Sequence, residues 1–384
     1  MLEGINPRLI FSIVFLIGLA ALLWKDRNKI ERHSILVIRR TQNGIQLLDK
    51  IAKKAPRFWN IYGWTGVIFA LISIPLMVLQ IGWMLKALLS GSSNGGASAI
   101  LPSLSGEATF QSGASFIPVE YWLISIAIIM VVHEASHGII ARMEDFEINS
   151  VGWLVLGIIP GAFVEPKGEQ MLPDGSSDSE GQEGLWDQGN YKQRLNVLSA
   201  GSFANYVTAA VFGLAYIGLI AFFLPNFYSG PVNYGAVVDG PAAQAGMTTG
   251  TLNSVNGQQI EDFNELRTVL NGTSPGENVT LETSEGEFRF ELGEREGLET
   301  GFIGISRTYS AGWEWFKGLL FMVAFLNFAI GMFNMLPAKP LDGGQIVDTF
   351  VEEFVGDEER KYVNHFSLVM WVIVLGSIIA GLIL

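Results

Sequence analysis

The chain has 384 residues, of which 49% are hydrophobic and 16% are charged, and its mean hydropathy is +0.35. This composition excludes an ordinary soluble protein and predicts several membrane-spanning helices in a lipid bilayer. The net charge of −13 argues against nucleic acid as a partner, and the absence of cysteine excludes disulfides, thiol nucleophiles and cysteine-ligated metal sites.

Segments of about 20 mostly apolar residues are long enough to cross the hydrocarbon core of a bilayer. Six stretches of the chain qualify or nearly do, so the sequence predicts a polytopic α-helical membrane protein with about six transmembrane helices. The six stretches are residues 7–24, 59–89, 118–141, 195–224, 313–336 and 366–384.

The arm between the first two spans is strongly basic. Residues 25–57 hold ten Lys/Arg against three Asp/Glu, and the positive-inside rule therefore places this arm in the cytoplasm. The apolar residues Ile45, Leu47, Leu48 and Ile51 lie among its lysines. They indicate either a short amphipathic helix on an anionic leaflet or a solvated basic linker.

Residues 148–164 are apolar but too short and too rich in glycine to span a bilayer as a helix. We expect a re-entrant or interfacial hairpin, whose backbone groups must pair within the protein.

Residues 225–310 differ from the rest, with four basic residues against twelve acidic ones and several strand-like runs around a helical stretch at 263–270. Counting spans from the basic arm places them on the extracytoplasmic side. The segment Gly240–Leu270, with its Pro-Ala-Ala, Ala-Gly and Val-Asn-Gly elements, resembles a PDZ domain, although Thr251 replaces an aspartate usual there.

The stretch Gly301–Ile305 resembles the carboxylate-binding loop of such domains. The resemblance implies that Gly301, Phe302, Ile303 and Gly304 bind a C-terminal peptide, which adds to the sheet as a strand. The alternatives are a size filter and a small domain that only spaces or shields the membrane core.

The third span contains the motif His133-Glu134-x-x-His137. Imidazoles at i and i+4 share one helical face and suit one metal ion, and Glu134 can serve as general base for a water molecule there. Ionisable groups within a span are costly and usually functional. The bland alternative is a pair of buried, hydrogen-bonded histidines. Zinc is the expected metal because imidazole and carboxylate suit it.

A catalytic zinc takes three protein ligands and keeps one open position. Asp342 is the best third candidate, because the prolines and glycines of Phe333–Ile346 break the helix beside it and let the carboxylate turn into the bundle. His365 lies at the edge of the last span, where we expect a surface role.

The HExxH motif and the later Asn334-x-x-Pro337…Leu341-Asp342-Gly343 segment together resemble the site-2 protease family of intramembrane zinc metalloproteases. The resemblance covers roughly residues 118–344, and some members have Pro-Asp-Gly where this chain has Leu-Asp-Gly. It implies one catalytic Zn²⁺ held by His133, His137 and Asp342, with Glu134 as the base.

The resemblance also implies roles for two further segments. Asn205, in Gly201-x-x-x-Asn205, would help to hold the substrate or the oxyanion, although a helix-packing face is the alternative. Phe163 and Val164, within Gly161–Pro166, would pair with an unwound substrate.

The sequence therefore predicts a multi-pass cell-membrane protease that cleaves single-span membrane proteins toward the cytoplasmic side of the bilayer. The predicted domains are an N-terminal helix and basic arm (1–58), a first membrane part (59–224), the PDZ-like domain (225–310) and a second membrane part (311–384). The alternatives are a non-enzymatic metal-binding or transport protein with a PDZ-type sensor, and an inactive homologue.

Overall fold

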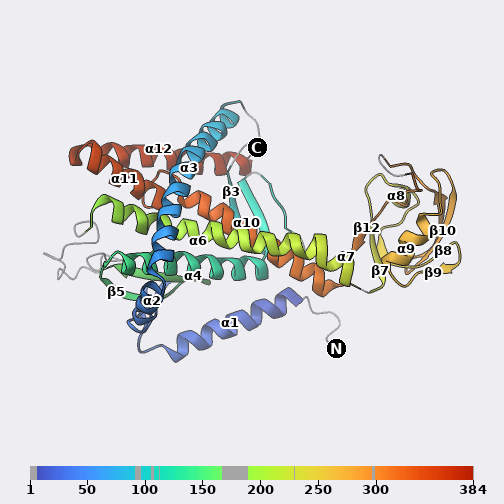
Figure 1. The fold of residues 1–384 in the computed structure, drawn as a ribbon, viewed down its shortest axis with the longest axis horizontal. Coiled ribbons are helices and arrows are strands. Elements are labelled where there is room, and N and C mark those ends of the chain that lie inside the picture. Colours follow the sequence, from blue (N-terminus) through green and yellow to red (C-terminus); the bar gives the residue numbers. More distant parts are fainter. Residues whose placement is uncertain are drawn as a thin grey trace. The chain divides into compact units, whose positions relative to one another are not determined.

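The structure is a computed structural model that describes residues 7–90, 97–104, 108–111, 113–166, 189–228, 230–295 and 299–383. These residues belong to two compact units (Figure 1). One comprises Met1–Gly213 and Phe321–Leu384, and the other comprises Leu214–Leu320.

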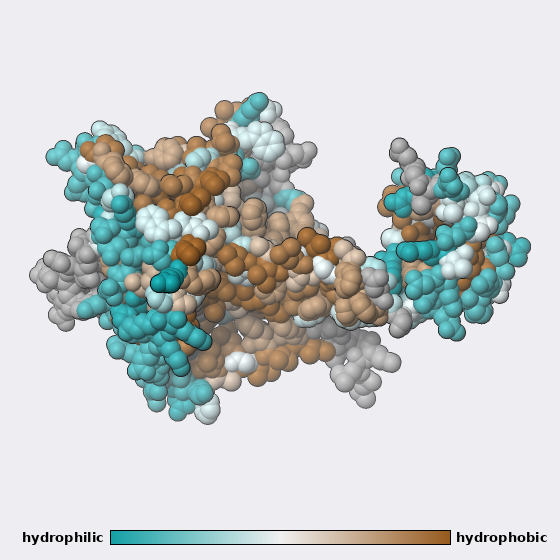
Figure 2. All heavy atoms as spheres, viewed as in Figure 1, coloured by the Kyte–Doolittle hydropathy of each residue, from teal (hydrophilic) through white to brown (hydrophobic). Residues whose placement is uncertain are grey.

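Long helices dominate the first unit, and the described residues of the chain contain five helices that are long and apolar enough to cross a membrane. In the first predicted span, residues 7–24, the apolar helical stretch is the shorter Ile10–Lys25. Many large apolar side chains point outward along these helices, as lipid contact requires, and Figure 2 shows them as broad hydrophobic surfaces. The helices are α1 (Pro7–Lys25), α3 (Pro56–Leu89), α4 (Val119–Met143), α6 (Tyr191–Gly218), α10 (Ala311–Asn334) and α12 (Arg360–Ile383).

The predicted hairpin at 148–164 is present as two antiparallel strands, β5 (Ile148–Leu156) and β6 (Ile159–Pro166). The basic arm unexpectedly adds two more strands, β1 (Glu31–His33) and β2 (Leu36–Thr41), which complete a sheet of order β1-β2-β5-β6. Strand β6 therefore lies at one edge of this sheet.

The arm also forms the predicted amphipathic helix, α2 (Asn43–Lys54). Part of its apolar face packs on the protein: buried Leu48 joins a cluster with Ile139 of α4 and Val151 of β5, whereas Leu47 is 58% exposed. The buried part of this face thus anchors the sheet to α4.

A further pair of strands, β3 (Ser98–Ser103) and β4 (Gly113–Pro118), is parallel and escaped prediction because the segment is rich in glycine, serine and alanine. The amide of Ala97 donates to Ser377 Oγ, which ties this region to α12.

The core of the first unit surrounds the connection between α10 and α11 (Asp342–Phe354). Met335, Leu336 and Ala338 are fully buried in that connection. They pack with apolar residues of α3, α6, α11 and α12, so the start of α11 is held from several sides. The cluster includes Val67, Met77, Ile81, Leu195, Leu198, Ile346, Met370 and Val374.

The second unit holds a sheet of order β11-β10-β8-β7-β12 around a core that includes Val232, Tyr234, Leu252 and Leu281. The helix predicted at 263–270 is confirmed with the same bounds and is capped by Asp262. The elements of the second unit include η2 (Leu219–Phe223), α7 (Leu224–Phe227), β7 (Val232–Ala236), α8 (Pro241–Gln244), β8 (Thr249–Val255), β9 (Gln258–Gln259), α9 (Phe263–Leu270), β10 (Asn278–Thr283), β11 (Gly286–Glu291) and β12 (Ile305–Thr308).

Candidate metal centre

The structure brings His133, His137 and Asp342 together, although they come from α4 and from the distant start of α11. One ligand atom from each lies within 4.8 Å of the others. Asp342 Oδ2 is 3.4 Å from His133 Nε2 and 3.6 Å from His137 Nε2, and the two Nε2 atoms are 3.1 Å apart. Two imidazole nitrogens and one carboxylate oxygen therefore point at a common space.

The donor set fits a zinc ion on chemical grounds. In the part of the chain that the structure describes, no lysine or arginine forms an ion pair with Asp342. Its carboxylate is largely withdrawn from solvent, and a buried carboxylate beside two imidazoles is neutralised best by a cation. Three N/O ligands with room for a fourth are the arrangement of a catalytic zinc site.

Asp342 reaches this position because α11 starts directly against the buried α10–α11 connection. A Cβ atom added at Gly343 would lie 2.7 Å from the carbonyl oxygen of Leu336, and one at Gly344 would lie 2.7 Å from that of Ala338. Both distances are shorter than real Cβ contacts. The two glycines after Asp342 are therefore required for close packing of the helix start.

Helix α6 passes directly over the two imidazoles at Gly201. A Cβ atom at this position would collide with His137 Nε2 and lie 2.7 Å from His133 Cε1. The glycine of the predicted Gly-x-x-x-Asn element thus lets the backbone of α6 approach the ligands.

The same helix offers a hydrogen-bonding group to each of the three candidate ligands. Two of these partners, the Val197 carbonyl and Ser202, were not anticipated from the sequence, where only the neighbouring Gly201 and Asn205 gave a signal. The contacts are Val197 O to His137 Nδ1 at 2.7 Å, Asn205 Nδ2 to His133 Nδ1 at 3.2 Å, and Ser202 Oγ to Asp342 Oδ2 at 3.3 Å.

Glu134 faces the edge strand β6. Its Oε2 atom accepts a hydrogen bond of 3.3 Å from the amide of Val164. Phe163 is only 2% exposed, and its ring lies over Gly152 of β5. Phe163 and Val164 were both predicted to bind substrate here. Because its side chain is buried, Phe163 can contact a substrate only through its backbone. The amide of Val164 is bonded to Glu134, the expected base.

The predicted peptide-binding loop lies in the second unit. The amide of Gly301 donates to Thr273 O and that of Phe302 donates to Gly293 O. Two amides of this loop are therefore already bonded within the second unit. His365 is exposed, as expected, and its Nδ1 contacts the carbonyl of Lys361.

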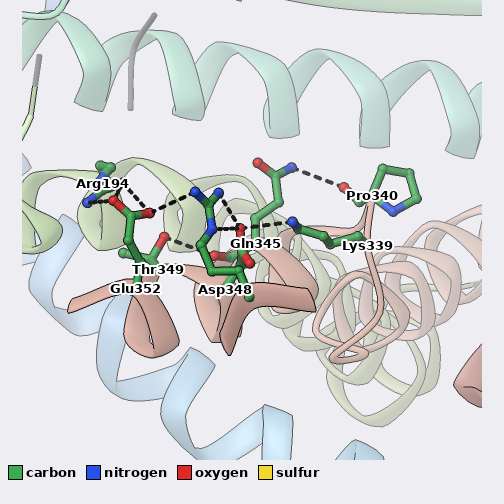
Figure 3. A pocket seen from close by; sticks show the side chains of 8 residues that line it. Arg194, Lys339, Pro340, Gln345, Asp348, Thr349 and Glu352 are labelled. Atoms are coloured by element: carbon green, nitrogen blue, oxygen red, sulfur yellow. Dashed lines mark hydrogen bonds and ion pairs between the residues drawn. The ribbon is translucent and has the colours of Figure 1, made fainter. Parts of the chain in front are cut away.

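A second charged cluster lies further along α11 (Figure 3). Asp348 contacts Lys339 Nζ at 2.9 Å and Arg360 at 2.8 Å, and Glu352 contacts Arg194 of α6 at 3.1 Å. We call these five residues the ion-pair cluster. They line a cavity of about 240 Å³ together with Pro340, Gln345 and Thr349.

Electrostatics within the ion-pair cluster favour ionised Asp348. Burial raises the pKa of its carboxyl, but the hydrogen bonds and charges of Arg360 and Lys339 outweigh burial and hold the pKa below its ordinary value. Lys339 belongs to the connection that precedes Asp342, so the cluster fastens that connection to α11 and α12.

Comparison with known proteins places these residues in context. A model of peptidase family M50 matches residues 121–377, a span that contains all three ligands and Glu134. An uncharacterised protein of Methanocaldococcus jannaschii is 26% identical over 372 residues, which cover 90% of each chain. A predicted zinc metalloprotease of Clostridium perfringens is 23% identical over 331 residues, which cover 67% of this chain and 95% of that protein.

Proposed function

We propose that the chain is an intramembrane zinc endopeptidase. The premise is that it belongs to peptidase family M50, the site-2 protease family. Its substrates would be single-span membrane proteins, cut within or near the transmembrane helix. The observation that carries this proposal is the convergence of His133, His137 and Asp342, with Glu134 one residue from the first ligand.

The roles of the residues follow from their chemistry. His133, His137 and Asp342 would hold one Zn²⁺, which when bound supplies Lewis acidity and lowers the pKa of a water molecule it holds toward ~7. Glu134 takes the proton from the attacking water and passes it to the leaving amine. The Val164 amide fixes one oxygen of Glu134, so the base has a defined orientation between the ligands and β6.

Substrate presentation would use the edge strand β6. The amides of a transmembrane helix are bonded within the helix, so the segment to be cut must first become extended. An extended segment can add to the free edge of a sheet through main-chain hydrogen bonds. The position of β6 at the sheet edge, in contact with Glu134, supports this arrangement.

The β-rich second unit would act as a PDZ-like domain on the extracytoplasmic side of the cell membrane. There it would screen or bind the stump of a substrate already trimmed outside, with a C-terminal peptide as the expected ligand. The basic arm would lie in the cytoplasm, and the cut would fall toward that side. The NH₂ group of Asn205 would donate to the oxyanion.

The Glu134→Gln substitution tests this proposal. The purified full chain is reconstituted in lipid vesicles with a single-span substrate, and both its zinc content and cleavage are measured. We expect Glu134→Gln to retain one zinc per chain and to lose cleavage by at least about 100-fold, because general acid–base catalysis contributes that much. The matched control, Glu353→Gln at an exposed position of α11, should cleave normally.

A Glu134→Gln variant that cleaves like the wild type would contradict the protease proposal. Zinc binding without cleavage in the wild type as well would instead favour a metal-binding or transport protein.

A further inference from the structure

Asn205 is the partner of a metal ligand, and its own surroundings are incomplete. The residue is fully buried on α6, and its amide group contacts Nδ1 of His133 at 3.2 Å. With Nδ2 facing the ring, Oδ1 has no hydrogen-bond partner among the described residues. A buried acceptor without a partner is unfavourable.

The orientation of this amide decides which nitrogen of His133 can bind a metal. A neutral imidazole that binds through Nε2 carries its proton on Nδ1, so the group facing Nδ1 must be an acceptor. An NH₂ group facing Nδ1 would require a lone pair there and would place the proton on Nε2. That atom is directed at His137 Nε2 and Asp342 Oδ2, where the proton would obstruct a cation.

The neighbouring ligand already follows the required rule. His137 contacts the carbonyl oxygen of Val197 through Nδ1, and a carbonyl can only accept. This contact fixes the proton of His137 on Nδ1 and leaves Nε2 free. His133 also interacts with the backbone of Gly201, and Asn205 is the side chain of the same helix that faces its Nδ1.

We infer that Asn205 directs its side-chain oxygen, rather than its nitrogen, at His133 Nδ1 and so fixes the ring in the tautomer that binds a cation through Nε2. A half-turn of the amide exchanges its oxygen and nitrogen, and the hydrogen-bonding partners decide between the two orientations. The half-turn gives the buried oxygen a partner and releases the NH₂ group.

Asn205 is therefore a positioning residue for His133. The oxyanion role proposed above uses the NH₂ group, and positioning uses the oxygen, so the two roles employ opposite ends of one amide. The inference rests on the proposed function only in taking zinc as the bound ion.

The test measures zinc affinity, which is independent of cleavage. Metal-free full-length protein in detergent is titrated with Zn²⁺ against a chromophoric chelator. Asn205→Leu keeps the size but removes the acceptor, and should weaken zinc binding by ~10–100-fold, as loss of a ligand's hydrogen-bond partner usually does. Asn205→Asp keeps an oxygen acceptor and removes the NH₂ group. It should stay within about threefold of the wild-type affinity while cleavage falls.

Asn327→Leu is the matched control, because Asn327 is also fully buried in a helix but its amide donates to Val323 O of its own helix. Its zinc affinity should equal that of the wild type. The inference is overturned if Asn205→Leu binds zinc as tightly as the wild type, or if Asn205→Asp binds as weakly as Asn205→Leu.

A second measurement does not depend on variants. In zinc-loaded wild type labelled with ¹⁵N-histidine, the His133 ring should carry its proton on Nδ1, and a proton on Nε2 would refute the inference. The chain has four histidines, which keeps the spectrum simple. Wild type that binds zinc in this way but cleaves nothing contradicts the protease proposal alone. Unchanged zinc affinity in an Asn205→Leu variant that still cleaves contradicts both roles of Asn205 and leaves the protease proposal standing.

Discussion

Helix α11 carries two carboxylates with opposite surroundings, Asp342 at its first residue and Asp348 further along. Asp348 is paired with Lys339 and Arg360, so the protein itself supplies the countercharge. The contacts of Asp342 are with two imidazoles and a serine hydroxyl. The difference shows that the neighbouring groups of a carboxylate, more than its burial, decide its role. A carboxylate beside lysine and arginine forms an ion pair, whereas one beside two imidazoles can bind a metal cation.

Replacement of Asp342 should have the largest effect. Asp342→Ala removes the only anionic ligand of the group, so zinc affinity should fall by more than about 100-fold and cleavage should disappear. This loss exceeds the one expected when a residue that only hydrogen-bonds to a ligand is replaced. Zinc content after dialysis and cleavage of a single-span substrate measure both. Asp348→Asn is the matched control and should keep its zinc. Equal zinc loss in the two variants would erase the distinction between the carboxylates.

Gly201→Ala should come next, because the added methyl group collides with the His137 ring. We expect at least tenfold weaker zinc binding and a loss of about 1–3 kcal/mol in the free energy of unfolding, as is typical of overpacking. Chelator competition and denaturant unfolding are the measurements.

Gly213→Ala on the same helix is the control, since its nearest neighbour would be Ala324 Cβ at 3.9 Å. That variant should bind zinc normally. Normal zinc binding by Gly201→Ala would show that α6 lies further from the ligands than described.

Asp348→Asn should act on stability alone. Lys339 and Arg360 would lose their countercharge, and we expect the free energy of unfolding to drop by about 1–3 kcal/mol, less than for a fully buried pair because both cations are partly exposed. Zinc affinity should be unchanged. An unaltered unfolding curve would mean that the ion-pair cluster does not hold the α10–α11 connection.

The smallest effect concerns pH. The pKa of Asp348 is lowered in the folded chain, so its contribution is complete above the ordinary carboxyl pKa of about 3.9 and is lost as pH falls through that value and below. The stability difference between wild type and Asp348→Asn should therefore shrink on acidification below about pH 4. Unfolding curves at several pH values measure it, and a difference that persists or grows in acid would contradict the ion pairing.

Local patterns predicted the candidate ligands but not the residues that support them. His133, Glu134 and His137 lie within five consecutive residues of one helix. Asp342 is followed directly by two glycines. Each of these signals can be recognised from a short segment of the sequence. The pairing of β2 with β5 joins segments more than a hundred residues apart, and no local periodicity encodes such a register.

The ion-pair cluster was missed for the same reason. Arg194, Lys339 and Arg360 belong to three separate parts of the chain, and each alone reads as an ordinary basic residue near the end of a span. One of the two interpretations of the basic arm placed the apolar face of α2 on a leaflet, because amphipathicity predicts a buried face without identifying what covers it.

X-ray absorption at the zinc edge of the purified full-length protein tests the central claim most directly. The account predicts one zinc per chain with nitrogen and oxygen ligands at about 2.0–2.2 Å, two of them imidazoles, and the loss of this signal in Asp342→Ala. A zinc shell without two imidazoles, or one that is unchanged in Asp342→Ala, would contradict it.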